Sequence, residues 1–165
     1  MLNTFRKTCS LLDKLFSWVA VLLLAVIIVA SSLQVFTRYV MNASMIGTEE
    51  LARFCFIWMS MLGGSICVGK SAHPAVTFIG DMLHGVSKKA LGIFIQILII
   101  LCSLIFVYYG YRMFRVTGSQ LSPTLGVRMS WVYLAIPIGG AGMILNALLN
   151  IFTAIAEKPN EEATA

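Results

Sequence analysis

Long apolar segments alternate with short clusters of charged residues along the chain. No Asp, Glu, Lys or Arg lies between Lys14 and Arg38, and further charge-free segments cover residues 54–69, 90–111 and 129–156. A helix needs about 20 apolar residues to cross a hydrocarbon core of roughly 30 Å. Three segments meet this length alone, and the second meets it if its first turn lies at the membrane interface. The pattern therefore predicts four transmembrane helices, near residues 15–38, 51–69, 90–113 and 131–155.

Composition excludes a soluble domain. Of the 165 residues, 59% are hydrophobic and 12% are charged, and the mean hydropathy is +0.89. Average soluble domains are roughly half apolar and about a quarter charged. A chain of this length has no way to enclose so much apolar surface. We expect an all-α membrane protein, with a single four-helix transmembrane domain over residues 1–156 and a polar tail over residues 157–165.

The first apolar segment has an alternative interpretation as a cleaved signal peptide, because Arg6, Lys7 and Lys14 precede it. Its uncharged stretch is about twice the length of the usual apolar region of such a peptide. A small-x-small cleavage site is not evident where the segment ends. We therefore expect this segment to be retained as a helix.

The distribution of basic residues predicts how the chain is oriented. Seven Lys and Arg residues fall on the side of the N-terminus, the second loop and the tail, against five on the opposite side. The positive-inside rule then favours both termini in the cytoplasm of a multi-pass protein of the bacterial inner membrane. The net charge of +5 indicates contact with membrane lipids. It does not indicate nucleic-acid binding, because no basic cluster is interleaved with stacking aromatic residues.

Two segments have the spacing of amphipathic helices that lie in the membrane interface. The N-terminal one has Leu2, Phe5, Cys9 and Leu12 near one face. The other lies in the second loop, where Pro74 suits a first helical turn. The alternative is an ordinary polar loop with some apolar residues. The apolar positions of the second segment are Phe78, Ile79, Met82, Leu83 and Val86.

The membrane spans lack the groups that coupled transport needs. A charged side chain at the bilayer centre costs at least about 2.5 kcal/mol, so pumps and transporters keep one only where it functions. Every charged residue here lies at or near a predicted helix end. A small four-helix exporter needs a carboxylate in its first helix, and this chain has none there. No proton or sodium site is therefore expected in the chain itself.

Redox and catalytic chemistry are equally unsupported. Cys9, Cys55, Cys67 and Cys102 form no C-x-x-C pair. Membrane haem requires His residues inside helices, whereas His73 and His84 both fall in the second loop. No nucleophile, base and orienting residue occur together. We therefore expect no catalytic, metal or cofactor site in this chain, and no enzymatic activity.

Small and amide residues within the spans are suited to helix association. Ser60 with Gly64, and Ala135 with Gly139, have the small-xxx-small spacing that lets helix backbones approach closely. These pairs are candidates for an interface with a partner, and ordinary internal packing is the alternative. Pro137 predicts a mild kink in the fourth span. The amides able to hydrogen-bond between helices are Gln34, Gln96, Asn146 and Asn150, the last two one turn apart on one face.

The densest charged cluster opens the second span, with Glu49, Glu50 and Arg53. Either glutamate has the spacing for an ion pair with Arg53. Acidic residues in a first turn also complement the helix dipole, so a well-built helix start is sufficient to explain the cluster. The more specific interpretation is that Arg38 and Arg53 flank the first hairpin and pair with these acids or with a partner.

Taken together, five short motifs resemble the small membrane subunit of tripartite ATP-independent periplasmic (TRAP) transporters. They follow the family's order along the whole chain, and four helices is the family's number. The departures are Gly47-Thr48 in place of a Trp before the glutamates, Thr77 in place of an acid, and Arg128 in place of a Pro. The motifs are Gln34-Val-Phe-Thr-Arg38-Tyr-Val40, Glu49-Glu-Leu-Ala-Arg53 with Phe56 and Trp58, Gly63 with Lys70-Ser-Ala-His73, Ser122-Pro-Thr-Leu-Gly126, and Tyr133-Leu-Ala-Ile-Pro137-Ile-Gly139.

The resemblance implies an accessory scaffold without catalysis. Its partners would be a large membrane subunit that carries the sodium and substrate sites, and a periplasmic binding protein that delivers an organic acid, such as sialic acid or a C4-dicarboxylate. The competing classes are a self-sufficient small transporter or exporter acting as a homodimer, and a redox membrane anchor. The charged candidates for partner contacts, for which headgroup anchoring is the alternative, are Arg38, Glu49, Glu50, Arg53, Arg112, Arg115 and Arg128.

Overall fold

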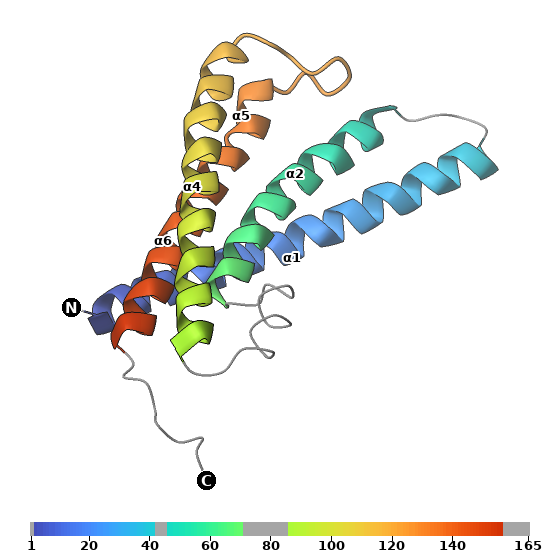
Figure 1. The fold of residues 1–165 in the computed structure, drawn as a ribbon. Coiled ribbons are helices and arrows are strands. Elements are labelled where there is room, and N and C mark those ends of the chain that lie inside the picture. Colours follow the sequence, from blue (N-terminus) through green and yellow to red (C-terminus); the bar gives the residue numbers. More distant parts are fainter. Residues whose placement is uncertain (1, 42–45, 71–85, 157–165) are drawn as a thin grey trace.

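The structure, a computed structural model, describes residues 2–41, 46–70 and 86–156 of the chain. Within these ranges four helical segments are long and apolar enough to cross a membrane, and the predicted all-α membrane fold is confirmed. The fourth segment consists of a short helix and a long one. Figure 1 shows the helices α1 (Leu2–Val40), α2 (Ile46–Gly69), α4 (Val86–Val116), α5 (Met129–Tyr133) and α6 (Ala135–Ala156).

The helices extend beyond the predicted spans, most of all at the N-terminus. Helix α1 begins at Leu2, so the amphipathic N-terminal segment is continuous with the first span. No Gly or Pro occurs between residues 2 and 40, so nothing in the backbone ends the helix at the membrane surface. The second interfacial segment lies outside the described residues, except for residues 86–88, which begin α4. The tail over residues 157–165 also lies outside them.

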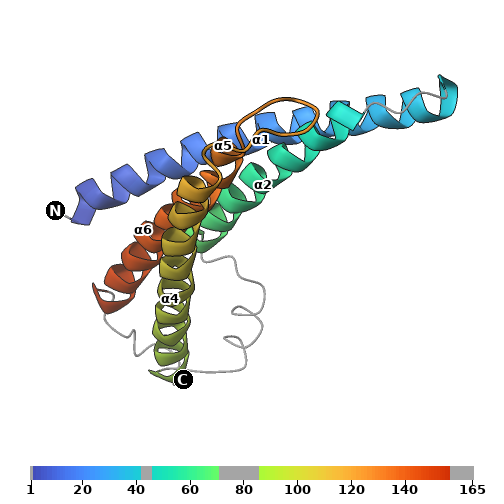
Figure 2. The ribbon, with the colours of Figure 1, turned by 90° about the horizontal axis from the view of Figure 1, so that it is seen from above.

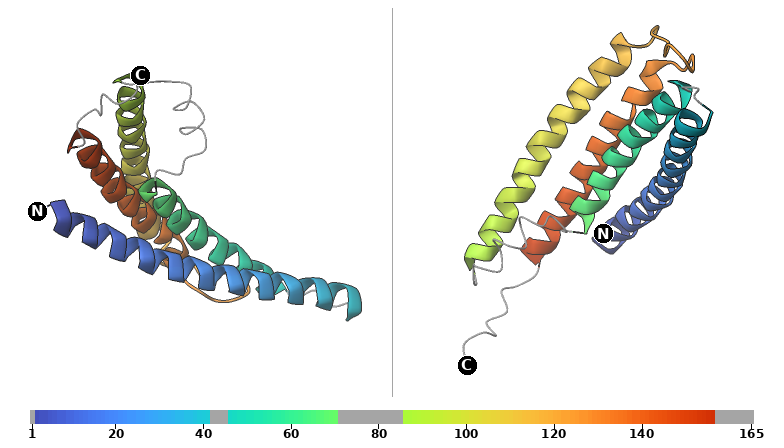
Figure 3. Two further views of the ribbon diagram at one scale, coloured as in Figure 1. Left: turned by 90° about the horizontal axis from the view of Figure 1, so that it is seen from below. Right: turned by 90° about the vertical axis from the view of Figure 1, so that its right-hand side faces the viewer.

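The four long helices form a single row in the order α1, α2, α6 and α4. Helix α1 packs on α2 and less extensively on α6, α2 packs on α6, and α6 packs on α4, whereas among the described residues α1 and α4 make no contact with each other. Figure 3 shows the row along its length, and Figure 2 shows that α1, at one edge, runs obliquely to α4, at the other. The inner helices are α2 and α6, and the edges are α1 and α4. The row does not close into a bundle.

Small residues bring the inner helices together. A methyl group on Gly139 of α6 would lie 2.7 Å from Met61 Cβ and 2.9 Å from the Met61 carbonyl oxygen of α2. Ala135, one turn earlier, has no exposed surface, and neither does Ser65 on α2. Close backbone approach through small residues is a usual basis of helix association in membranes. The core of this chain is therefore a backbone contact rather than a cluster of large side chains.

The fourth span is interrupted at Leu134, between α5 and α6. Pro137 has no N–H to donate to the carbonyl of Tyr133, four residues earlier. On either side, Leu134 N donates to Ser130 O at 3.0 Å and Ile138 N to Leu134 O at 3.3 Å. The backbone therefore stays nearly helical through a local disturbance. The helix boundary thus lies three residues before Pro137, at which the sequence predicts a mild kink.

The row has two ends with different charged residues. At the N-terminal end, α1 and α4 begin and α2 and α6 finish. At the loop end, α1 and α4 finish, α2 begins, and residues 117–128 connect α4 to α5 (Figure 1). The charged partner candidates all lie at the loop end.

Candidate interaction surfaces

The loop over residues 117–128 has a defined, hairpin-like backbone. Ser122 N donates to Val127 O at 2.9 Å, and Met129 N donates to Gln120 O at 2.9 Å. Gly126 closes the turn with a φ of 64°, a conformation that favours glycine. The Ser122-Pro-Thr-Leu-Gly126 segment is thus a structured turn at the entry to α5.

Glu50, at the start of α2, fixes this turn from the side. Its Oε2 atom accepts a hydrogen bond from the Ser122 hydroxyl, and accepts further bonds from the backbone N–H groups of Thr124 at 3.3 Å and Leu125 at 3.2 Å. A carboxylate that accepts several donors makes charge-assisted bonds, which are stronger than those between neutral groups. Glu50 is therefore a structural residue of the loop end and joins α2 to the loop after α4.

Glu49 takes the ion-pair role that the sequence leaves open between the two glutamates. Its Oε1 atom lies 2.9 Å from Arg53 Nη2, one turn along α2, and both side chains are more than half exposed, at 55% and 65%. Exposed pairs of this kind contribute less than about 1 kcal/mol. Both residues therefore remain accessible to another molecule.

The remaining basic candidates lie on the surface of the loop end. Arg38 is exposed in the last turn of α1. Arg112 and Arg115 are exposed on α4, where they line a shallow groove of about 440 Å³ with Tyr108 and Tyr111. Arg128 precedes α5, and its side chain makes no capping hydrogen bond there. The structure thus gathers the charged candidates at one end of the row.

The four small-residue candidates differ in whether they pack against another helix of this chain. Ala135 and Gly139 lie inside the chain's own packing, and the Gly139 backbone meets Met61 of α2. Gly64 faces Met143 of α6. Ser60 is exposed, but its hydroxyl donates to the Phe56 carbonyl of its own helix at 2.7 Å. Contact of these four residues with a partner stays a prediction.

The amides of α6 bind the backbone of α2 near the N-terminal end. Asn146 Nδ2 donates to Ser65 O at 3.0 Å, and Asn150 Nδ2 donates to Val68 O at 2.7 Å. Asn146 Nδ2 also lies 2.8 Å from Asp13 Oδ1 on α1, so one buried amide joins three helices. The sequence predicts interhelical bonding of both Asn residues, but it gives no signal for the role of Asp13. Gln96 Oε1 is buried with no hydrogen-bond partner among the described residues.

Metal or disulfide chemistry has no support in the described part of the chain. No three His, Cys, Asp or Glu side chains gather there in a way that would hold a metal ion. Cys9, Cys55, Cys67 and Cys102 are all free thiols. His73 and His84 lie outside the described residues.

An open row of long apolar helices with a structured, charged loop end is typical of a multi-pass membrane protein. Residues 27–157 match the family model of the DctQ component of tripartite ATP-independent periplasmic transporters, and the chain belongs to this family. It is 27% identical over 151 residues to the sialic acid TRAP transporter small permease protein SiaQ of Vibrio cholerae, which covers 92% of this chain and 86% of that protein. A small permease of Haemophilus influenzae with the name "putative TRAP transporter small permease protein" is 24% identical over 144 residues, covering 87% of this chain and 88% of the relative.

A longer relative matches a smaller share of its own length. The sialic acid TRAP transporter permease protein SiaT of Haemophilus influenzae is 28% identical over 127 residues, which are 77% of this chain but 21% of that protein. The chain is thus a small TRAP permease subunit and a multi-pass protein of the inner membrane. Membership of the family implies a large membrane subunit as partner. A family of transporter subunits also argues against an enzyme.

Proposed function

We propose that this chain is the scaffold of a sodium-coupled transporter for organic acids, which stabilises a large subunit that carries the sodium and substrate sites. Its loop end faces the periplasm and helps to dock a soluble binding protein. Both termini then lie in the cytoplasm. The first substrate to test is sialic acid, because the relatives named SiaQ and SiaT are sialic acid permeases. A C4-dicarboxylate is the second.

The open row is the observation that carries the scaffold role. A transport pathway needs helices on all sides of a path, whereas in the described part of this chain α1 and α4 lie at opposite edges without touching. Outward-facing apolar side chains cover α1 and α4 in particular. Such a row leaves its faces and edges available to lipid and to another set of membrane helices.

The position of the charges supports the same role. Residues 15–37, 54–69, 90–111 and 129–156 contain no Asp, Glu, Lys or Arg, so the middle of each span lacks a group that binds a coupling ion. Helix α1, longer than the predicted first span, does contain one carboxylate, Asp13, near its N-terminal end, but the Asp13 Oδ1 atom already accepts the Asn146 amide. Ion coupling is then the task of the partner.

Two features of the loop end support docking of the binding protein: its hydrogen-bonded turn and its positive charge. The turn that Glu50 holds presents exposed Pro123 and Leu125, and Arg112, Arg115 and Arg128 lie exposed around the same end. A rigid apolar tip with a basic rim suits the recognition of an acidic protein surface.

The test is reconstitution with and without this chain. The tagged chain is purified from its native membrane in mild detergent, and the proteins that accompany it are identified by mass spectrometry. We expect one large polytopic membrane protein at about equal amount. Proteoliposomes that contain both subunits should take up labelled sialic acid when sodium and the binding protein are supplied.

The same preparations test the competing class. Proteoliposomes that contain this chain alone should show no uptake. A chain recovered as a homodimer that transports a substrate alone would overturn the scaffold role. Uptake by the large subunit at an unchanged rate and stability after removal of this chain would overturn it too.

A further inference from the structure

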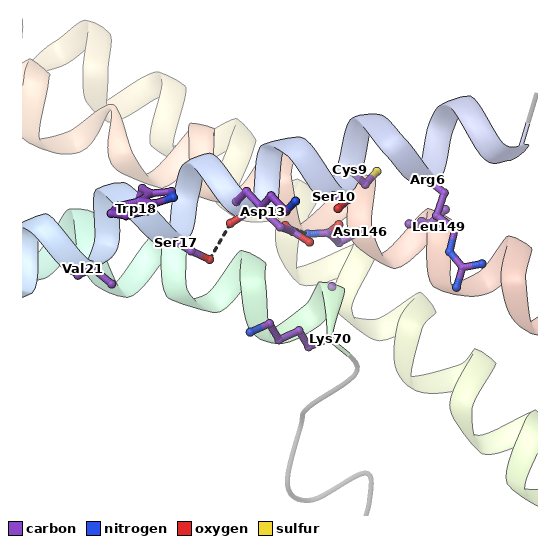
Figure 4. A pocket seen from close by; sticks show the side chains of 12 residues that line it. Arg6, Cys9, Ser10, Asp13, Ser17, Trp18, Val21, Lys70, Asn146 and Leu149 are labelled. Atoms are coloured by element: carbon purple, nitrogen blue, oxygen red, sulfur yellow. Dashed lines mark hydrogen bonds between the residues drawn. The ribbon is translucent and has the colours of Figure 1, made fainter.

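A cleft of about 630 Å³ opens at the N-terminal end, between α1, the end of α2 and α6 (Figure 4). The loop end and its partner candidates are at the other end of the row, so this cleft is separate from them. Three basic side chains line it: Arg6 and Lys14 from α1, and Lys70 from the residue that follows α2. In Figure 4, Arg6 and Lys70 extend from different segments on the same side of α1.

These three cations have no counter-ion in the described part of the chain. The single ion pair found there joins Arg53 and Glu49 at the loop end. Asp13 is the one acid in the cleft lining, and its Oδ1 atom accepts the buried Asn146 amide at 2.8 Å. The cleft therefore holds three positive charges against one negative charge, and all three basic side chains are exposed. This excess charge suits an anion.

The cleft changes from polar to apolar along α1. Lys14, Trp18 and Val21 follow one another at helical spacing and share one face. Trp18 is 77% exposed and Val21 is 62% exposed, in the direction of the charge-free middle of the span. Tryptophan is typical of the boundary between headgroups and hydrocarbon. A ligand that fills this cleft therefore needs an anionic group at one end and a hydrocarbon chain at the other.

We propose that the cleft binds one anionic phospholipid. Its phosphate diester lies among Arg6, Lys14 and Lys70, and an acyl chain follows Trp18 and Val21 along α1. Free phosphate could occupy the basic half of the cleft but makes no use of the apolar half. The apolar half therefore distinguishes a phospholipid from free phosphate, because only the lipid has a hydrocarbon chain to place there.

The test is native mass spectrometry of the delipidated full chain in mild detergent, titrated with palmitoyl-oleoyl phosphatidylglycerol. Palmitoyl-oleoyl phosphatidylcholine, which is zwitterionic, and inorganic phosphate serve as comparison ligands. We expect a saturable 1:1 complex with phosphatidylglycerol and much weaker binding of phosphatidylcholine. Inorganic phosphate at millimolar concentration should not displace the lipid. Equal binding of the two lipids, or displacement by phosphate, would overturn the proposal.

Variants then locate the site. Lys14→Gln and Lys70→Gln should each weaken phosphatidylglycerol binding by about fivefold, the usual effect of one basic residue on an anionic headgroup. Lys7→Gln is the matched control, because Lys7 is exposed on the same helix but does not line the cleft. Trp18→Ala should also weaken lipid binding, and Trp131→Ala, which changes an exposed Trp at the loop end, should not. Equal effects of the cleft variants and their controls would overturn the proposal. Because Lys14 and Lys70 are changed in separate variants, the second variant still tests the site if the first one misfolds.

Discussion

The Glu50 carboxylate accepts a hydrogen bond from the hydroxyl of Ser122, a residue 72 positions later in the chain. This bond connects the first turn of α2 to the turn before α5. In the sequence, all of α2 and all of α4 lie between these two segments. The N–H groups of Thr124 and Leu125 point to the same oxygen. One side chain thus sets the conformation of the segment that we propose meets the binding protein.

Replacement of Glu50 should release that turn. In Glu50→Ala, the N–H groups of Thr124 and Leu125 lose their acceptor, so we expect their amide hydrogen exchange to accelerate toward the rate of unprotected amides. Sialic acid uptake by the two-subunit complex should fall as well. Hydrogen exchange with mass spectrometry over residues 117–128 measures the first effect, and proteoliposome uptake measures the second.

Glu49→Ala is the matched control for this prediction. It removes a neighbouring carboxylate of the same helix turn, but among the described residues that carboxylate pairs with the exposed Arg53 and not with the turn. Exchange over residues 117–128 should then stay at the level of the unmodified chain. Equal acceleration in both variants would show that the turn does not depend on Glu50.

Substitution of Gly139 should separate the two inner helices. A methyl group there meets the Met61 backbone oxygen at 2.9 Å, and backbone has little freedom to move aside. We expect Gly139→Ala to lower the free energy of unfolding by about 1–3 kcal/mol, as overpacking usually does. Gly63→Ala on α2 is the control, because nothing lies within 4 Å of its added methyl group. That variant should be more stable by about 0.5–1 kcal/mol, and thermal unfolding in detergent compares the two.

Loss of the Asn146 amide should weaken the junction of three helices. In Asn146→Ala, Asp13 Oδ1 and the Ser65 carbonyl lose their donor, and we expect a destabilisation of about 1–2 kcal/mol. Asn150→Ala, which removes a single bond to Val68 O, should cost about 0.6 kcal/mol. Asp13→Ala combined with Asn146→Ala should cost less than the sum of the two single changes. Strict additivity in this double-mutant cycle would contradict a direct Asp13–Asn146 interaction.

Removal of positive charge from the groove on α4 should weaken docking without affecting the fold. We expect Arg112→Gln with Arg115→Gln to raise, several-fold, the concentration of binding protein that gives half-maximal uptake. The effect should shrink at high salt, because charge contacts at an interface rim act mainly on the association rate. Lys7→Gln, at the other end of the row, serves as the control. An unchanged concentration dependence in the arginine variant would count against docking at this surface.

The spans were predictable because a helix that crosses the hydrocarbon core needs a long segment without charged residues. Residues 15–37 and 90–111 are such segments. The i,i+4 spacing of Asn146 and Asn150 likewise indicated two polar contacts on one face, and both reach α2. The start of α1 was not predictable from hydropathy, because a helix backbone without Gly or Pro continues beyond the membrane surface. The pairs Glu50–Ser122 and Asp13–Asn146 depend on the order of the helices in the row, and hydropathy contains no information about that order.

The row also has a consequence for biosynthesis. Helix α4 contacts α5 and α6 among the described helices, and α6 lies between α2 and α4 although it follows both in the chain. We therefore expect that, in a nascent chain that ends at residue 128, α1 packs on α2 while α4 still lacks the helices that it contacts in the complete fold. Helix α6 contacts both α2 and α4, so the complete row forms only after α6 has been made.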